Sequence, residues 1–396
     1  MPQDTVDAVV IVSAVRTPMG AFQGVFSHAS AVDLGAVATR EALNRAGLNN
    51  NDIDELIFGC VLPAGLSQAP ARQVALASEL DLTTSCSTIN KVCGSGMKAA
   101  MIAHDQIKAG SCDVAIAGGM ESMTQAPYFL AKAREGMRLG HGEIKDHMFF
   151  DGLEDAYTGR LMGSFAQEIA DKYQLGREQM DAYAIESLAR ANNAVKQGHF
   201  RDEIAEVTVS SRKGEFTVAD DEQPGKAKPE KIPKLKPAFS ADGTVTAANS
   251  SSISDGAAAL VLMKESEASK RGLKPIARIV AHASHAQHPG EFAIAPVGAM
   301  TKLLDKCDWS LDEVDLFEIN EAFAMVALYA MQSMDLDHNK VNINGGACAL
   351  GHPLGASGAR IIVTLIYALR RLQKQRGIAS LCIGGGEATA IAIELV

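Results

Sequence analysis

Two parts of the chain repeat the same order of apolar segments and glycine-rich turns, and this repeat restricts the possible folds more than any other feature. Four segments of the first part have counterparts in the second, in the same order and at similar spacing: 8–12 with 277–281, 53–60 with 314–320, 87–96 with 341–346, and 113–119 with 380–385. A chance match at one pair is easy, but four matches in register are not. In both parts strand patterns alternate with helical patterns, which indicates an α/β fold with a central sheet. We therefore expect two copies of one α/β unit, with reactive residues of both meeting at the shared interface.

The local patterns predict individual elements. Continuous apolar runs over 8–12 and 255–262 are typical of strands that are buried on both faces. A helix is expected over 33–46, with Gly47 as its C-terminal cap. Further elements are expected as helices over 69–79, 177–197 and 359–371, and as a strand followed by a polar turn over 244–252.

The segment between the copies, from about 120 to 245, has many charges and scattered Gly and Met. Its end, 224–237, contains five lysines and only one acidic residue, Glu230. The whole chain has a formal net charge of −10, which argues against general nucleic-acid binding, because that function needs a basic face. The basic stretch could be a solvated loop or a local site for an anionic ligand.

The cysteines and the hydropathy pattern indicate the compartment. Seven Cys is an odd number in a chain of 396 residues without a secretory start, so reduced thiols and a cytoplasmic location are expected. No Cys-x-x-Cys pair occurs and metal-ligand spacing is absent, so no metal is expected. The longest apolar run, near 361–369, is too short to span a bilayer, so no membrane partner is expected.

Cys93 lies on a glycine-rich turn, residues 90–97, directly before a helical pattern. Gly94 and Gly96 allow the backbone to turn sharply and to approach a ligand closely. A Cys at the start of a helix faces free N–H groups and the positive end of the dipole, and both favour the reactive thiolate. Alone, however, Cys93 would more often be a buried residue that packs as a small hydrophobe.

Three residues of the second copy could complete a site with Cys93. His352 precedes a helical pattern, as Cys93 does, and a neutral imidazole within reach of a Cys can take its proton. Cys382 opens a turn of three glycines, whose uncovered N–H groups suit an oxyanion, and it could be a second acid or base or only pack. Asn320 offers a neutral donor, or it caps the helix that follows.

Four separated motifs together resemble the thiolase family, in order and spacing and over nearly the whole chain. They are Asn-Lys-Val-Cys-Gly-Ser-Gly at 90–96, Asn-Glu-Ala-Phe at 320–323, Gly-His-Pro-Leu-Gly at 351–355 and Cys-Ile-Gly-Gly-Gly at 382–386. The form around Cys93 is more similar to the acetoacetyl-CoA (biosynthetic-type) branch than to the long-chain 3-ketoacyl branch, which tends to have Cys-Ser-Ser-Gly.

The resemblance implies an α/β thiolase fold, with two repeated five-layered α/β/α/β/α halves and an inserted loop domain. The N-terminal half would comprise 1–121 and 246–273, and the C-terminal half 274–396. The insertion, 122–245, would bind CoA and make oligomer contacts. A homodimer or homotetramer is implied, with 120–150 as a candidate contact segment.

The activity implied by the resemblance is that of an acetyl-CoA C-acetyltransferase, an acyltransferase that condenses two acetyl-CoA reversibly to acetoacetyl-CoA and CoA. Deprotonated by His352, Cys93 would attack acetyl-CoA and hold the acetyl group as a thioester. Cys382 would take a proton from the methyl carbon of a second acetyl-CoA, and the carbanion would attack acetyl-Cys93. One oxyanion would be bound by His352 and a water held by Asn320, the other by the N–H groups of Cys93 and Gly384. Coenzyme A thioesters are the substrates, and no metal or redox cofactor is implied.

The same resemblance assigns six residues to the pantetheine and acyl pocket: Leu153, Met162, Phe239, Ala247, Ser251 and Phe323. Basic residues at Arg212, Lys213 and 226–236 would lie near the CoA phosphates. The chain departs from the family pattern in four places without losing a catalytic group: Leu161, the stretch 292–296 that begins with Phe292, Cys348, and the stretch 387–389 that begins with Glu387. Since the first two of these would lie near the acyl pocket, the preferred chain length stays open.

Three alternatives remain. A 3-ketoacyl-CoA thiolase that cleaves longer chains in fatty-acid β-oxidation would share these motifs. A condensing enzyme of the ketoacyl-synthase type usually pairs its Cys with two His, or with His and Asn, and lacks the second Cys, so Cys382 speaks against it. A non-catalytic CoA-binding or scaffold protein of the same fold would not need to retain all four of Cys93, Asn320, His352 and Cys382.

Overall fold

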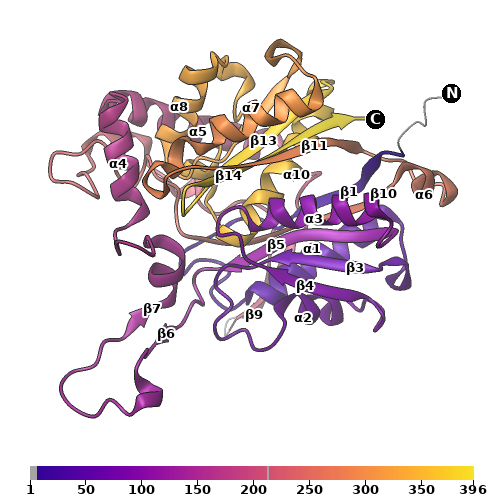
Figure 1. Ribbon diagram of the computed structural model, residues 1–396, viewed down its shortest axis with the longest axis horizontal. Helices are drawn as coiled ribbons and strands as arrows, with labels where there is room; N and C mark the ends of the chain where they lie inside the picture. Colours follow the sequence, from indigo (N-terminus) through magenta and orange to yellow (C-terminus); the bar gives the residue numbers. More distant parts are fainter. Residues whose placement is uncertain (1–6, 212–213) are drawn as a thin grey trace.

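The computed structural model describes residues 7–211 and 214–396. In this part of the chain, ten strands form one large sheet, in which β2 (Gly20–Ala21) pairs with β10 beside the main path. The order along that path is β12-β13-β14-β11-β1-β10-β5-β3-β4. Helices cover both faces of this sheet, and the termini of the described chain lie near the same end of the molecule (Figure 1).

The N-terminal half of the sheet consists of β1 (Val9–Arg16), β10 (Ser254–Lys264), β5 (Val114–Ser122), β3 (Glu55–Gly59) and β4 (Ser85–Ile89). The first three strands are antiparallel to one another, and β5, β3 and β4 are parallel. β1 and β5 are buried along their whole length, as their continuous apolar runs predict. Although β10 is distant in sequence, it lies between them.

The C-terminal half repeats this arrangement with β11 (Ala277–Ala286), β14 (Glu387–Leu395), β13 (Arg376–Ile383) and β12 (Leu316–Ile319). The first three strands are antiparallel, and β12 and β13 are parallel. Three of the four matches in the sequence repeat are therefore pairs of strands. In the fourth, the counterpart of β4 is only an isolated bridge from Val341 to Phe317. β14 lies outside the predicted elements.

Five layers result from packing the two halves against each other. The helices α3 (Ser95–Ala109) and α10 (Leu354–Leu372) lie between the half-sheets and share one apolar core with strands of both. The outer face of the N-terminal half is covered by α1 (Ala31–Ala46) and α2 (Pro70–Ala77). The outer face of the C-terminal half is covered by α7 (Ala295–Cys307) and α8 (Ala324–Met334). Within residues 7–211 and 214–396, the pairing of β1 with β11 joins the two half-sheets.

Helix α10 begins at Leu354, five residues before the predicted start at 359. Its first turns contain Gly355 and Gly358, and glycine is a poor helix former, so the pattern alone gives no signal there. A Cβ at Gly358 would lie 2.4 Å from the backbone nitrogen of Met97, on α3. These glycines therefore allow α10 and α3 to approach closely.

The strand predicted at the start of 244–252 is wrong. The backbone N–H groups of Thr244 and Val245 donate to the side chain of Gln167, at 2.8 and 2.9 Å, and the N–H of Thr246 donates to Asn249. Side chains thus satisfy the donors that a strand would use in a ladder, and the segment runs as an irregular loop.

The segment between β5 and β10 contains α4 (Met162–Lys172), α5 (Arg177–Gln197) and two hairpins, β6–β7 (Tyr128–Phe129 with Lys145–Asp146) and β8–β9 (Val207–Ser211 with Gly214–Val218). Helix α5 has the predicted bounds, and α1 ends at Gly47 in the left-handed conformation, as predicted. The β6–β7 hairpin extends away from the body of the molecule (Figure 1). Among the described residues, no helix is both long and apolar enough to cross a membrane.

Candidate active site

The loops that carry Cys93 and His352 meet because they precede the two central helices. Cys93 lies two residues before α3, and His352 lies two residues before α10. A Cβ at Gly96 would lie 2.9 Å from the carbonyl oxygen of Gly355, so the starts of the two helices are in close contact. The internal repeat therefore places one reactive residue of each half at one point of the central layer.

The Cys93 turn is held in a strained conformation. Val92 has φ 46°, which is unusual for a β-branched residue. The N–H of Lys91 donates to the Ser95 hydroxyl at 2.8 Å, and that hydroxyl donates to the Val92 carbonyl at 2.7 Å. These bonds fix the turn and orient the half-buried Cys93.

The ionisation of Cys93 differs from the expectation for a helix start. Burial raises the pKa of Cys93 to about 11, although N–H groups of Gly384 and of Cys93 itself act in the opposite direction. Burial outweighs these dipoles because a charged sulfur loses its water. At neutral pH the residue is therefore a thiol that needs a base.

His352 is a buried neutral imidazole. Its Nδ1 lies 2.6 Å from the Ser357 hydroxyl, which donates its own proton to the Pro353 carbonyl at 2.8 Å. Since a hydroxyl has one proton, Nδ1 must carry the hydrogen, and Nε2 retains a lone pair. Burial, and then the charge of Arg360, lower the pKa of His352 to about 3. Nε2 is buried and has no hydrogen-bond partner among the described residues.

Asn320 and Cys382 are buried next to these two residues, Asn320 beside His352 and Cys382 near Cys93. Asn320, directly after β12, places its amide nitrogen 3.5 Å from His352 Nδ1 and accepts from Arg360 at 3.4 Å. Cys382 is almost fully buried near the end of β13. Burial, and then the nearby sulfur of Cys93, raise the pKa of Cys382 well above its ordinary value.

A cavity of about 630 Å³ opens beside Cys93, His352 and Gly384. All six residues predicted for the pocket line it: Leu153, Met162, Phe239, Ala247, Ser251 and Phe323. Leu161 and Phe292, two departures from the family pattern, line it as well. Asn320 and Cys382 are not among its lining residues. Asn320 lies beside His352 and Cys382 lies near Cys93, and these two neighbours do line the cavity.

Sequence reasoning missed several residues of this region. Phe149 and Phe22 line the cavity, and they come from segments without a recognisable motif. Ser357 lies one helical turn into α10, and only the folded chain shows that its hydroxyl meets Nδ1 of His352. Glu121 accepts N–H bonds from Val61 and Leu62, at 3.0 and 3.1 Å, and from Gly355 at 2.8 Å. It therefore ties the start of α10 to the N-terminal half.

The two reactive loops are also joined by an ion pair. Lys91 precedes Cys93 by two residues, and its ammonium group contacts the carboxylate of Glu387, which follows the glycine turn 384–386. Both side chains are partly exposed, so water screens their attraction. Glu387, a departure from the family pattern, thus contacts the Cys93 loop.

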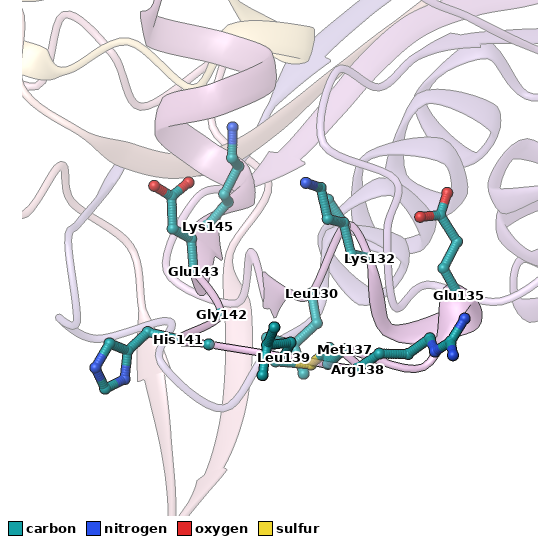
Figure 2. Close-up of a pocket in the computed structure, with 12 residues that line it drawn as sticks. Leu130, Lys132, Glu135, Met137, Arg138, Leu139, His141, Gly142, Glu143 and Lys145 are labelled. Atoms are coloured by element: carbon teal, nitrogen blue, oxygen red, sulfur yellow. The ribbon is translucent and has the colours of Figure 1, made fainter.

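A second hollow of about 600 Å³ lies far from these residues in the β6–β7 hairpin. Figure 2 shows that charged side chains, among them Lys132, Glu135 and Lys145, project from this segment beside Leu130 and Leu139. Its lining comes entirely from residues 130–145. The hollow contains none of the reactive residues described above.

Comparisons with known proteins agree with this geometry. Residues 9–266 match the family model "Thiolase, N-terminal domain", and 273–395 match "Thiolase, C-terminal domain". A probable acetyl-CoA acetyltransferase of Dictyostelium discoideum is 48% identical over 98% of this chain and 94% of its own length. An acetyl-CoA acetyltransferase of Escherichia coli is also 48% identical, over 97% of this chain and 98% of its own.

Solved structures give the same result. The acetyl-CoA acetyltransferase of Bacillus anthracis superposes with a TM-score of 0.97 at 42% identity, over 99% of each chain. A thiolase from Ascaris suum in complex with coenzyme A gives a TM-score of 0.93 at 44% identity, covering 98% of this chain and 100% of that one. With the repeated halves and the motif residues gathered at their interface, these matches show that the chain belongs to the thiolase family.

Proposed function

We propose that this thiolase is an acetyl-CoA C-acetyltransferase, which condenses two acetyl-CoA reversibly to acetoacetyl-CoA and CoA through an acetyl-Cys93 intermediate. One observation carries the proposal: the half-buried thiol of Cys93 and the imidazole of His352, with its unpartnered Nε2, line the same apolar cavity. The names of the similar proteins support acetyl-CoA as the substrate.

In the first half-reaction, His352 Nε2 takes the proton of Cys93 as the sulfur attacks the thioester carbonyl. The pKa of Cys93, about 11, and that of His352, about 3, keep both groups neutral before substrate binds. Proton transfer must therefore accompany the attack, when the charge moves from sulfur to the carbonyl oxygen. His352 then returns the proton to the departing CoA sulfur.

Two sets of donors are assigned to the oxygens that carry developing charge. The N–H groups of Cys93 and Gly384, which already face the Cys93 sulfur, would bind the oxygen of the acetylated residue. A water held by Asn320, together with His352 when its Nε2 carries a proton, would bind the oxygen of the second acetyl-CoA. Donors of this kind are each worth about 10²–10³ in rate.

In the second half-reaction, Cys382 is the base that removes a proton from the methyl group of the second acetyl-CoA. To act as a base, Cys382 must first give up its own proton, which burial opposes most and the nearby sulfur of Cys93 opposes further. Acetylated Cys93 can no longer become a thiolate. We therefore infer that Cys382 ionises without a competing negative charge only in the acetyl-enzyme, which orders the two steps.

The cavity and its surroundings suggest how coenzyme A binds. The apolar wall suits pantetheine and a short acyl group, and it includes Phe239 and Ala238, next to the lysine-rich stretch 226–236. Lysines 228, 231, 234 and 236 are exposed, so we assign the CoA phosphates to this stretch. Arg212 and Lys213, also predicted for this purpose, lie outside the described residues. CoA thioesters are the only cofactor-like molecules that the proposal needs.

The remaining assignments rest on the same family membership. We propose residues 1–121 with 246–273, and 274–396, as the two thiolase halves, and 122–245 as the loop domain for CoA and for oligomer contacts. A homodimer or homotetramer in the cytoplasm, working in fatty-acid metabolism, completes the proposal. Cleavage of longer 3-ketoacyl-CoAs is not favoured by the named relatives.

Acetylation of the protein tests the assigned nucleophile. After mixing with acetyl-CoA, intact-mass spectrometry should find one acetyl group on the wild-type chain and on Cys382→Ala, but none on Cys93→Ala. Cys112→Ala, which removes a half-buried thiol away from the cavity, is the control and should be acetylated. Cys382→Ala should form no acetoacetyl-CoA. An acetyl group retained on Cys93→Ala would refute the assignment.

A further inference from the structure

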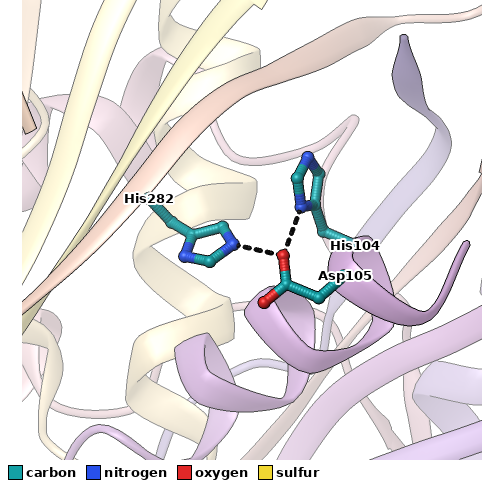
Figure 3. A group of neighbouring side chains, drawn as sticks. All are labelled: His104, Asp105 and His282. Carbon is teal, nitrogen blue, oxygen red and sulfur yellow. Dashed lines mark hydrogen bonds and ion pairs between the residues drawn. The ribbon is translucent and has the colours of Figure 1, made fainter. Parts of the chain in front are cut away.

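Two histidines and an aspartate from opposite halves of the molecule converge outside the active site. His104 and Asp105 are on α3, and His282 is on β11 of the other half-sheet. One carboxylate oxygen of Asp105 lies 3.0 Å from His104 Nδ1 and 2.8 Å from His282 Nε2. Figure 3 shows the carboxylate between the two imidazoles.

These three side chains have the donor chemistry of a transition-metal site. The two ring nitrogens and a carboxylate oxygen all lie within 4.8 Å of one another. Among the described residues this is the one group of three such side chains close enough to hold an ion. Two imidazoles and one carboxylate suit Zn²⁺ and related divalent ions, which bind at about 2.0–2.2 Å from such ligands. Small shifts of the side chains would bring all three atoms to that distance.

The surroundings allow an ion to enter and hold its ligands in place. The side chains of His104 and His282 are 9% and 15% exposed, whereas that of Asp105 is 57% exposed, so solvent reaches the cluster from the carboxylate side. The carbonyl of His282 accepts a hydrogen bond from the Lys306 ammonium group at 3.0 Å, which fixes this part of β11. The rings of His104 and His282 are perpendicular, with centroids 5.1 Å apart.

The geometry points to a site for a divalent transition metal of the Zn²⁺ class, formed by His104 Nδ1, the Asp105 carboxylate and His282 Nε2, with water as the fourth ligand. Binding needs each neutral imidazole to carry its proton on the other ring nitrogen. The ion replaces the two hydrogen bonds to Asp105 and links α3 to β11. Along α3 the cluster is about 14 Å from the start of the helix, and therefore from the Cys93 turn.

Zinc binding to the purified full-length chain tests this inference. After treatment with a chelator, wild-type protein should take up one Zn²⁺ per chain in a calorimetric titration, and Zn²⁺ should raise its Tm, because an ion that binds only the folded state stabilises it. Loss of an outer partner of a metal ligand costs about 10–100-fold in affinity, so His282→Ala, which removes a ligand itself, should cost at least 100-fold. His141→Ala, in the exposed hairpin, is the matched control and should bind like wild type.

Two further measurements keep the result unambiguous. Asp105→Asn nearly preserves shape, so it should fold and yet lose affinity even if His282→Ala is unstable. Bound Co²⁺ should show ligand-field bands without a thiolate charge-transfer band, which separates this cluster from the active-site cysteines. The inference is overturned if wild-type protein takes up no Zn²⁺, if His282→Ala and Asp105→Asn bind as tightly as wild type, or if the Co²⁺ spectrum requires sulfur.

Discussion

At Cys93 and His352, burial shifts the pKa values of two neighbouring groups in opposite directions. It raises the pKa of the thiol to about 11 and lowers that of the imidazole to about 3, so both groups are neutral over the physiological range. A buried neutral histidine can serve as a base only if its lone pair is on the nitrogen that faces the substrate. The hydroxyl of Ser357 decides this, because it accepts from Nδ1.

Replacing Ser357 by alanine should therefore slow the reaction while the fold remains. The buried Nδ1–H loses its acceptor, which costs about 1–3 kcal/mol and corresponds to about 5–150-fold in kcat. Steady-state kinetics with acetoacetyl-CoA and CoA would measure the loss. Ser78→Ala removes another buried hydroxyl, bonded to the Ala36 carbonyl at 3.3 Å, and should leave kcat unchanged. Equal kcat values for the two variants would show that Ser357 does not orient His352.

The buried carboxyl group of Glu121 makes the stability of the protein depend on pH. Burial raises the pKa of Glu121 to about 7, despite the N–H groups that favour its charged form. A carboxyl group with a higher pKa in the folded state binds its proton more tightly there. Its contribution to stability is therefore complete below the unfolded pKa near 4.5 and is lost as pH rises through about 7.

We expect wild-type protein to lose free energy of unfolding between about pH 5 and pH 8 relative to Glu121→Gln, which cannot ionise. Urea unfolding at several pH values would measure the difference between the two proteins. Glu267→Gln is the control: hydrogen bonds from Arg271 and Lys270 lower the pKa of Glu267, so the difference of this variant from wild type should stay constant between about pH 5 and pH 8. A pH-independent difference for Glu121→Gln would contradict the raised pKa.

Among the elements, α3 and α10 matter most, because each carries a reactive loop at its start and both lie between the half-sheets. At the starts of the two helices the contact includes three glycines, Gly96, Gly355 and Gly358, which allow the backbones to approach closely. The distance between the helices therefore sets the distance between the Cys93 and His352 loops. A methyl group added in this contact would push the helices apart and so change the distance between the two loops, without touching the substrate.

For this reason Gly358→Ala should lower both stability and kcat. The new Cβ would lie 2.4 Å from the Met97 backbone nitrogen, and such overpacking costs about 1–3 kcal/mol. The free energy of unfolding in urea and kcat would be measured together. Gly176→Ala is the matched control, since a Cβ there meets nothing within 4 Å and should leave both values near wild type. A wild-type kcat in Gly358→Ala would show that the contact between α3 and α10 does not control the geometry of the active site.

For the whole molecule, a group of exposed apolar side chains lies on the β6–β7 hairpin, which projects from the body: Tyr128, Leu130, Met137, Leu139 and Ile144. Leu139 is 98% exposed and Ile144 is 69% exposed. An exposed apolar segment of this kind is typical of a surface that another subunit covers. It fits the proposed contact segment 120–150.

Leu139→Glu should consequently reduce the mass of the assembly in light scattering, because a carboxylate would be buried without a partner. Phe216→Glu, on the separate β8–β9 hairpin, changes another exposed apolar side chain and should leave the mass unchanged. An unchanged mass for Leu139→Glu, or a wild-type mass equal to one chain, would exclude the hairpin as the contact.

The sequence by itself determined the repeated α/β plan, the helix over 177–197 and the Gly47 cap, because these depend on local periodicity and turn chemistry. The six residues of the pocket wall were implied by the resemblance to the thiolase family, and all six line the cavity. The sequence did not determine β14, the loop 244–252 or the first turns of α10. There, side-chain bonds from distant residues and helix contacts override local preference. Only the tertiary structure decided that Cys93 is a thiol, that Ser357 orients His352 and that His104 and Asp105 meet His282. Burial and proximity are properties of the folded chain, and no spacing along the sequence contains them.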